Sequence, residues 1–312
     1  MSAMDMTTTI LMTVITGAVP LLYACIGEIF SQKAGIMNLG LEGIMLIGAV
    51  IGYYTGYKTG NMLIAVLVVA AVGIVIGLGY AFLTVTLKAN QAVSGLALVT
   101  FGTGMSGFLG KSLTGVASPY KISTVAIPGL SKIPVIGEAL FHQDPLVYIL
   151  YLLIPLSAVF MAKTKPGMIL RALGENPGAL DADGYHVTAL RYAYVTLGCA
   201  LTSIGGAYLT LVSTPFWNDN MTAGKGWIAS ALVIFSTWNP VIAIGGALLF
   251  SGINVLTNYI PMIFPDISTF FLKMLPYLCT IIVLIFSTGS FRKNKHTAQP
   301  AMLCIPYDRE ER

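Results

Sequence analysis

Charged residues are scarce in this chain of 312 residues. Asp, Glu, Lys and Arg make up 10% of it and hydrophobic residues 56%, whereas an ordinary soluble domain carries about 25% charged residues. The mean hydropathy is +0.81. A helix needs roughly 20 apolar residues to cross a bilayer core of about 30 Å, and many uncharged stretches reach that length. The shortage of charge therefore excludes a soluble domain and predicts an all-α polytopic membrane protein.

The sequence also lacks the motifs of common enzymes. It contains no HExxH segment, no GxSxG segment and no Walker A lysine motif, so we expect neither hydrolytic activity nor ATP binding by this chain. The four cysteines form no CxxC pair and are interpreted as small packing residues or idle thiols. We therefore expect no metal site, no cofactor in this chain and no enzymatic activity. Nucleic-acid binding is not expected either, because most of the basic residues lie in short loops and the tail, where they set the topology.

The apolar stretches predict about nine membrane spans, within a range of about eight to ten. Segment 225–238 is short for a full crossing and follows Gly224-Lys225-Gly226, so we expect a broken or re-entrant helix there. The predicted spans are 8–30, 36–57, 61–87, 92–111, 145–162, 190–213, 225–238, 240–260 and 271–289.

The spans form one predicted membrane domain, residues 1–290, followed by a polar tail, residues 291–312, which we expect to be disordered or loosely packed. Many glycines lie inside the spans, and small residues allow close helix packing in lipid. Segments 34–52 and 223–246 both begin with glycines before a hydrophobic helix. This similarity is a weak sign of an internal repeat, a common feature of transporters.

The basic residues predict the orientation of the chain. They crowd the loop 163–190 and follow the last span, and the positive-inside rule assigns both regions to the cytoplasm. The N-terminus and the loop 112–144 then lie outside, and the C-terminus lies in the cytoplasm. Prolines in the outer loop indicate a folded loop. Pro166-Gly167 and Asn176-Pro177 in the inner loop predict a short helix, a turn and a second short helix.

Polar residues interrupt the apolar pattern at 27–46, GEIFSQKAGIMNLGLEGIML. We expect Glu28 to lie at the inner rim of the membrane and to pair with Lys33. If residues 33 to 42 are helical, Glu42 lies roughly 13 Å deeper than Lys33, with Asn38 on the same face. A carboxylate at that depth either accepts hydrogen bonds from other helices or lines a polar pathway.

Four segments carry patterns that can be compared with known families: GEIFSQKAGIMNLGLEGIMLIGA at 27–49, ANQAVSGLAL at 89–98, RALGENPGALDADGYHV at 171–187 and GWIASALVIFSTWNP at 226–240. They resemble ABC importer permeases for simple sugars and nucleosides, and the similarity covers nearly the whole membrane domain. The resemblance implies a bacterial cytoplasmic (inner) membrane permease that works with a second permease chain, with ABC ATPase subunits that hold ATP and Mg, and with an external substrate-binding lipoprotein.

The third segment resembles the coupling segment through which such permeases contact the ATPase. The match implies that role for Arg171, Gly174, Glu175, Asn176, Ala179, Ala182 and Gly184. We expect the substrate to pass a cavity between two permease chains that is lined by Asn38, Glu42, Thr100 and Asn254.

The pattern GExxxxxxGxxNxGxEGxM is closer to nucleoside permeases than to ribose permeases, so it favours nucleosides as the substrate. Simple sugars and branched-chain amino acids are the alternative substrates. A proton-coupled secondary transporter and a structural membrane protein are the alternatives of another class.

Overall fold

The computed structural model describes residues 3–116, 120–133, 135–214, 216–263 and 299–309, with short runs between 268 and 285. Among them, six helices are long and apolar enough to cross a membrane, which confirms an all-α polytopic protein. The last predicted span, 271–289, is described only at scattered positions between 271 and 285, and these positions are helical. The six helices are α1 (Ala3–Lys33), α3 (Met62–Ala81), α4 (Gln91–Gly110), α6 (Pro145–Lys163), α9 (Val187–Tyr208) and α11 (Pro240–Ile263), and α2 (Leu41–Thr59) is a further long helix.

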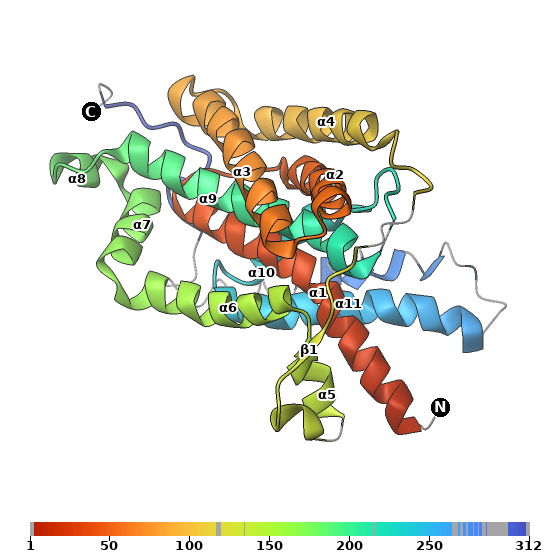
Figure 1. Ribbon diagram of the computed structural model, residues 1–312. Coiled ribbons are helices and arrows are strands. Elements are labelled where there is room, and N and C mark those ends of the chain that lie inside the picture. The colour runs from red at the N-terminus through yellow and green to blue at the C-terminus, as the bar shows by residue number, and fades with distance from the viewer. Residues whose placement is uncertain are drawn as a thin grey trace.

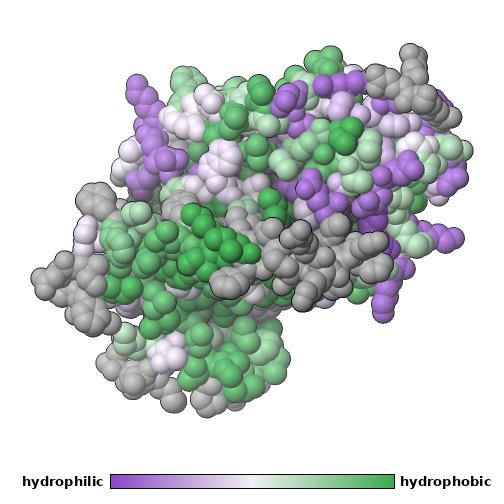
Figure 2. Space-filling model, turned by 180° about the vertical axis from the view of Figure 1, so that it is seen from behind, coloured by the Kyte–Doolittle hydropathy of each residue, from purple (hydrophilic) through white to green (hydrophobic). Residues whose placement is uncertain are grey.

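Helices α1 and α9 pack against each other through the centre of the molecule. Helices α2, α3 and α4 lie on one side of this pair, and α6 and α11 lie on the other (Figure 1). The outer helices α3 and α4 keep many large apolar side chains exposed, as helices that face lipid do. Figure 2 shows hydrophobic side chains over much of the rear face and hydrophilic ones gathered toward its ends.

Glycines allow the central helices to approach closely. A Cβ at Gly27 of α1 would overlap the Gly198 carbonyl of α9, and a Cβ at Gly102 of α4 would overlap the backbone of Gly43 in α2. These contacts confirm the predicted glycine packing at both crossings. Gly104 of α4, by contrast, has nothing of the described chain within 4 Å of such a Cβ.

Short polar residues fix where several helices begin. Asn61 accepts hydrogen bonds from the first amides of α3, and Asn90 accepts one from Val93 in α4. Asp144 caps α6 in the same way. These side chains satisfy amides that have no partner within the helix. The π-helical turns η1 (Phe82–Thr86) and η3 (Leu209–Ser213) extend α3 and α9.

Residues 34–40 are not helical, so the predicted span from residue 36 begins too early. Gly35 has φ of 86°, a left-handed conformation that favours glycine. The link then turns back along α1, where the Asn38 amide donates to Glu28 Oε1 at 2.9 Å. Glu42 therefore lies in the first turn of α2. The expected helix through residues 33 to 42, with Asn38 and Glu42 on one face, is wrong.

A second non-helical approach precedes α10 (Lys225–Phe235). Helix α10 has 11 residues, which span about 16 Å, so the predicted broken helix is confirmed. Gly224 has φ of 84° at its start. The two glycine-rich approaches that resemble each other in sequence thus both lead into a helix from a non-helical segment.

The loop between α6 and α9 forms the predicted helix, turn and helix. These are α7 (Lys165–Glu175) and α8 (Pro177–Ala182). Thr164 Oγ1 caps α7 by accepting from the Gly167 amide at 3.1 Å. Asn176 Oδ1 caps α8 by accepting from the Ala179 amide at 3.1 Å. The two helices project from one end of the molecule (Figure 1).

The predicted outer loop, 112–144, is folded where the structure describes it. Strands β1 (Val125–Ala126) and β2 (His142–Gln143) pair antiparallel, with the single turn η2 (Leu130–Lys132) and the short helix α5 (Ile136–Phe141) between them. The Tyr148 hydroxyl on α6 donates to the Val125 carbonyl at 2.7 Å. This loop lies near the N-terminus, at the end opposite α7 and α8 (Figure 1).

The C-terminal tail is packed where it is described. The Met302 amide donates to the Gly174 carbonyl at 2.8 Å, and the Cys304 amide donates to the Gly35 carbonyl at 3.2 Å. Leu303 is only 5% exposed. The expectation of a loosely packed tail is therefore wrong for residues 299–309, because backbone hydrogen bonds and apolar burial hold this segment. The other tail residues, 291–298 and 310–312, lie outside the described part of the chain.

Candidate functional site

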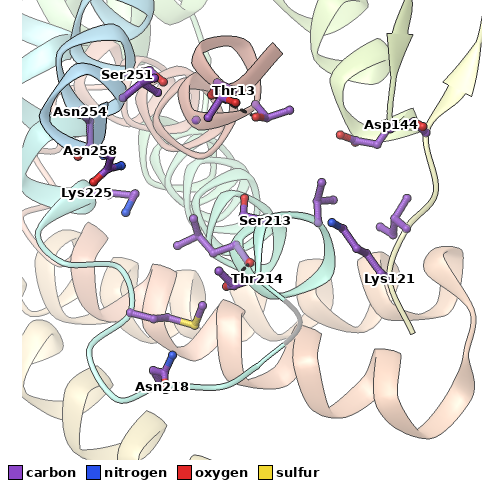
Figure 3. A pocket seen from close by; sticks show the side chains of 18 residues that line it. Thr13, Lys121, Asp144, Ser213, Thr214, Asn218, Lys225, Ser251, Asn254 and Asn258 are labelled. Atoms are coloured by element: carbon purple, nitrogen blue, oxygen red, sulfur yellow. Dashed lines mark hydrogen bonds between the residues drawn. The ribbon is translucent and has the colours of Figure 1, made fainter. Parts of the chain in front are cut away.

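A cavity of about 670 Å³ opens beside the start of α10. The N-terminal half of α1, the C-terminal half of α11, the end of η3 and two loop segments enclose it (Figure 3). Its volume falls within the range of small-molecule pockets, about 300–1,000 Å³. The polar lining residues are Thr13, Thr16, Lys121, Thr124, Asp144, Ser213, Thr214, Asn218, Lys225, Ser251, Asn254 and Asn258.

Two asparagines of α11 offer hydrogen-bonding groups to the cavity. Asn254 and Asn258 lie four residues apart on α11 and therefore share one face of the helix. Their side-chain amides form no hydrogen bond with other described residues, and both residues are exposed. Figure 3 shows them beside Lys225. A smaller cavity of about 350 Å³ shares all three residues with the first, so one polar cluster serves both spaces.

Two charged residues that line the cavity, Lys225 and Asp144, differ in how many hydrogen bonds they already form within the chain. Lys225 begins α10, is partly buried and donates to the Thr222 carbonyl at a long 3.3 Å, which leaves donor capacity on its ammonium group. Asp144 Oδ2 accepts from the Tyr208 hydroxyl at 2.7 Å, and Oδ1 accepts from two amides of α6. Burial raises the pKa of Asp144, although these hydrogen bonds oppose the shift. Lys225 is thus the better placed to bind a ligand.

Glu42 holds the chain segment that carries Lys225. Its Oε1 accepts from the Thr222 hydroxyl at 2.5 Å and from the Gly224 amide at 2.8 Å, and its Oε2 accepts from the Gly226 amide at 2.6 Å. The side chain is buried. A Cβ at Gly226 would overlap the Glu42 backbone. Glu42 therefore joins α2 to the start of α10 and is not a lining residue of the cavity.

Asn38 belongs to a second buried network, between α1 and the link 34–40. Its Oδ1 accepts from the Gly40 amide at 2.8 Å, and Glu28 Oε1 accepts from both the Asn38 amide and Gln32 Nε2. Gln32 Oε1 in turn accepts from Trp238 Nε1 at 2.8 Å. Glu28 thus bonds to Gln32 and Asn38, and its expected pairing with Lys33 is wrong. The network ties the link 34–40 and Trp238, which follows α10, to α1.

The four predicted pathway residues do not come together. Asn254 lines the cavity, Asn38 and Glu42 are buried in the two networks, and Thr100 is exposed on α4, where its hydroxyl donates to the Leu96 carbonyl. Sequence reasoning missed Lys225 and Asn258 as lining residues. The glycines on both sides of Lys225, and the spacing of four between Asn254 and Asn258, were the signals that could have found them.

A comparison with known protein families identifies the family of this chain. The sequence pattern described as branched-chain amino acid transport system / permease component matches residues 10–284. The chain belongs to this permease family. Its membership confirms the resemblance seen in the sequence motifs.

Curated relatives of the permease match along most of their length. It is 33% identical to a putative glucose ABC transporter permease, TsgC13, of Haloferax volcanii, over 95% of this chain and 96% of the relative. It is 31% identical to the guanosine ABC transporter permease NupQ of Bacillus subtilis, over 86% and 88%. It is 35% identical to the nucleoside ABC transporter permease NupC of Lactococcus lactis, over 86% and 89%. No solved structure matches the chain.

The segment of the permease that resembles a coupling segment presents an exposed tip. Gly174 is the exception among its predicted residues: it is buried, and a Cβ there would overlap the Lys33 carbonyl. Leu180, within the same segment, is also buried. The exposed residues are Arg171, Glu175, Asn176, Ala179, Ala182 and Gly184. Their contact with an ATPase stays a prediction.

Proposed function

We propose that this permease is the membrane subunit of an ATP-driven ABC importer and that it carries nucleosides across the bacterial cytoplasmic membrane. The observation that carries the proposal is the polar cavity, where free amides of α11 face a broken helix. Discontinuous helices commonly form transporter binding sites. Two curated relatives whose names specify guanosine or nucleosides support this substrate class.

The cavity lining suits an uncharged ligand with many hydrogen-bonding groups. Asn254 and Asn258 each offer a donor and an acceptor, and serine and threonine hydroxyls add both kinds. Ile122, Leu209 and Val212 provide apolar surface in the same cavity. A nucleoside combines ribose hydroxyls with an aromatic base and can use both kinds of surface. A simple sugar is the second candidate, because a relative is named a putative glucose permease and hydroxyls alone also fit the lining.

The ATPase partners would bind the end of the molecule that carries α7 and α8. Lys163, Lys165 and Arg171 lie on α6 and α7 at this end, and Lys88 lies beside the tail; the positive-inside rule favours a cytoplasmic position for this end. The cavity at the opposite end would then receive substrate from an external binding lipoprotein. A second permease chain would complete the pathway, as the resemblance implies.

The broken helix supplies a physical basis for gating. Glu42 and Gln32 hold the two ends of the segment from Thr222 to Trp238, so movement of α1 or α2 moves α10 and the Lys225 side chain with them. ATP binding would shift the coupling segment and favour one of two arrangements of these helices. ATP and Mg would be held by the ATPase subunits.

Competition for uptake tests the substrate assignment. Cells that lack their own nucleoside transporters receive this permease with its neighbouring ATPase and binding-protein genes, and uptake of labelled guanosine is measured. Excess unlabelled nucleosides should abolish uptake, whereas leucine should leave it unchanged. Competition by glucose or ribose at equal strength would favour the sugar assignment, and competition by leucine would contradict both.

A further inference from the structure

The described C-terminal segment, residues 299–309, runs across three loops at one end of the molecule. The amide of Met302 donates to the Gly174 carbonyl at 2.8 Å, on α7 of the coupling segment. The amide of Cys304 donates to the Gly35 carbonyl at 3.2 Å, in the link between α1 and α2. Backbone hydrogen bonds thus join the tail both to the coupling segment and to the start of the link that leads into α2.

Two ion pairs extend the same connection. Lys88, in the loop before α4, pairs with Asp308, and Arg309 Nε lies 2.9 Å from Asp181 Oδ2 on α8. The sequence-adjacent residues Asp308 and Arg309 therefore bind the loop before α4 and the tip of the coupling segment. In Figure 1 the described tail segment runs toward the end of the molecule that carries α8.

Apolar packing secures the tail between these contacts. Leu303 is buried and belongs to the same hydrophobic cluster as Leu173 and Leu180, which lie on α7 and α8. The Tyr307 ring faces the buried Arg191 guanidinium of α9, with Cζ 6.0 Å from the ring centroid. The segment is therefore fixed by main-chain bonds, charge pairs and burial together, and not by a single exposed contact.

The contacts also lead toward the cavity. Gly35 begins the link that continues into α2, and Glu42 at the start of α2 holds the segment from Thr222 to Gly226 beside the cavity. A displacement of α7 or α8 would thus act on the cavity through the tail and α2, in addition to the direct helix contacts.

We propose that residues 299–309 are a clasp, a positioning segment that fastens the coupling segment to the loops before α2 and α4, so that movement driven by the ATPase reaches the cavity. This inference rests on the proposed ATP-driven function. The clasp contacts no substrate and acts through the segments it joins. Without the clasp, the ATPase would still hydrolyse ATP, but fewer substrate molecules would be transported per ATP hydrolysed.

Truncation tests the clasp in the complete transporter. The complex is reconstituted in proteoliposomes with ATP inside, and labelled nucleoside taken up is measured per ATP hydrolysed. A chain that ends at Gln299 should transport at least about five-fold less substrate per ATP hydrolysed. This is the lower end of the typical change in affinity that coupling between two sites produces. The matched control ends at Arg309 and removes only residues 310–312. It should behave as the full chain does.

A charge exchange provides the second test and does not depend on a large deletion. Lys88→Asp and Asp308→Lys should each lower transport per ATP by about two-fold, because an exposed ion pair contributes modestly. The double variant should recover the lost coupling. A purely structural role would change the amount of assembled complex and leave its transport per ATP unchanged.

The outcomes separate the clasp from the proposed function. An assembled truncated complex that keeps the full transport per ATP overturns the clasp. If the truncated chain does not assemble, the charge exchange decides: recovery in the double variant supports the clasp, and single variants with full coupling overturn it. Absence of ATP-driven uptake by the full-length complex contradicts the proposed function instead.

Discussion

Replacement of Glu42 by alanine should loosen the broken helix. The change removes three hydrogen bonds to the carboxylate and leaves the Thr222 hydroxyl and the amides of Gly224 and Gly226 without their acceptor. Each buried donor left unsatisfied costs about 1–3 kcal/mol. We expect a total loss of about 3–5 kcal/mol, below the full sum because water from the adjacent cavity can reach some of these groups.

Glu42→Gln refines the prediction. The Gln carbonyl can still accept from Thr222 and Gly224, but its NH2 group faces the Gly226 amide, so two donors oppose each other. One lost charged hydrogen bond costs about 1.5–3 kcal/mol. The stability of the glutamine variant should therefore lie between those of the wild type and the alanine variant.

Buried thiols offer a direct assay. Cys25 and Cys199 are buried, whereas Cys304 is exposed, so the increase in labelling by a thiol-reactive dye above that of the folded protein reports exposure of the buried thiols as the purified protein is heated. The midpoint temperature should fall from wild type to Glu42→Gln to Glu42→Ala, and nucleoside uptake should fall in the same order. Glu138→Ala serves as the matched control, because Glu138 is exposed on α5. A midpoint and uptake for Glu42→Ala equal to those of this control would refute the reasoning.

Three further predictions concern the cavity and the coupling segment. Asn254→Ala and Asn258→Ala should each raise the KM for nucleoside uptake about five-fold, which corresponds to the loss of about one hydrogen bond. Thr100→Ala should leave KM unchanged. Equal effects at all three positions would argue against recognition of the substrate by α11. Gly226→Ala should lower uptake and cost about 1–3 kcal/mol of stability, because the added Cβ meets the Glu42 backbone. A midpoint temperature equal to that of the wild type would disprove this prediction. Replacement of α7 and α8 by a flexible linker should abolish copurification of the ATPase, and retained copurification would contradict the coupling role.

The hydrophobic runs predicted most of the helices. The uncharged stretches of about 20 residues predicted α1, α3, α4, α6, α9 and α11, because every helix that crosses a bilayer needs the same minimum length. Helix-breaking residues predicted the finer features. Pro166-Gly167 and Asn176-Pro177 indicated α7 and α8, and the short hydrophobic run after Gly224 indicated the broken helix. These signals are local in sequence, and local patterns are what a single sequence reveals.

The non-helical link at 34–40 escaped prediction because it is as apolar as a helix. Length and hydropathy cannot separate the two, and only the spacing of Gly35 and Gly40 around Asn38 indicated a turn. The cavity escaped for another reason. Asn254 and Lys225 come from different elements, and one sequence contains no information on which segments meet. The packed tail was missed similarly, since its partners lie more than a hundred residues earlier.

The central claim is that ATP hydrolysis by partner subunits drives nucleosides through this permease. It is tested most directly in proteoliposomes that contain the permease with its ATPase and binding-protein partners. We predict that uptake of labelled guanosine requires ATP on the ATPase side, persists when a proton uncoupler is added, and disappears when the ATPase is omitted. Uptake by the permease alone, driven by a proton gradient and abolished by the uncoupler, would contradict the claim.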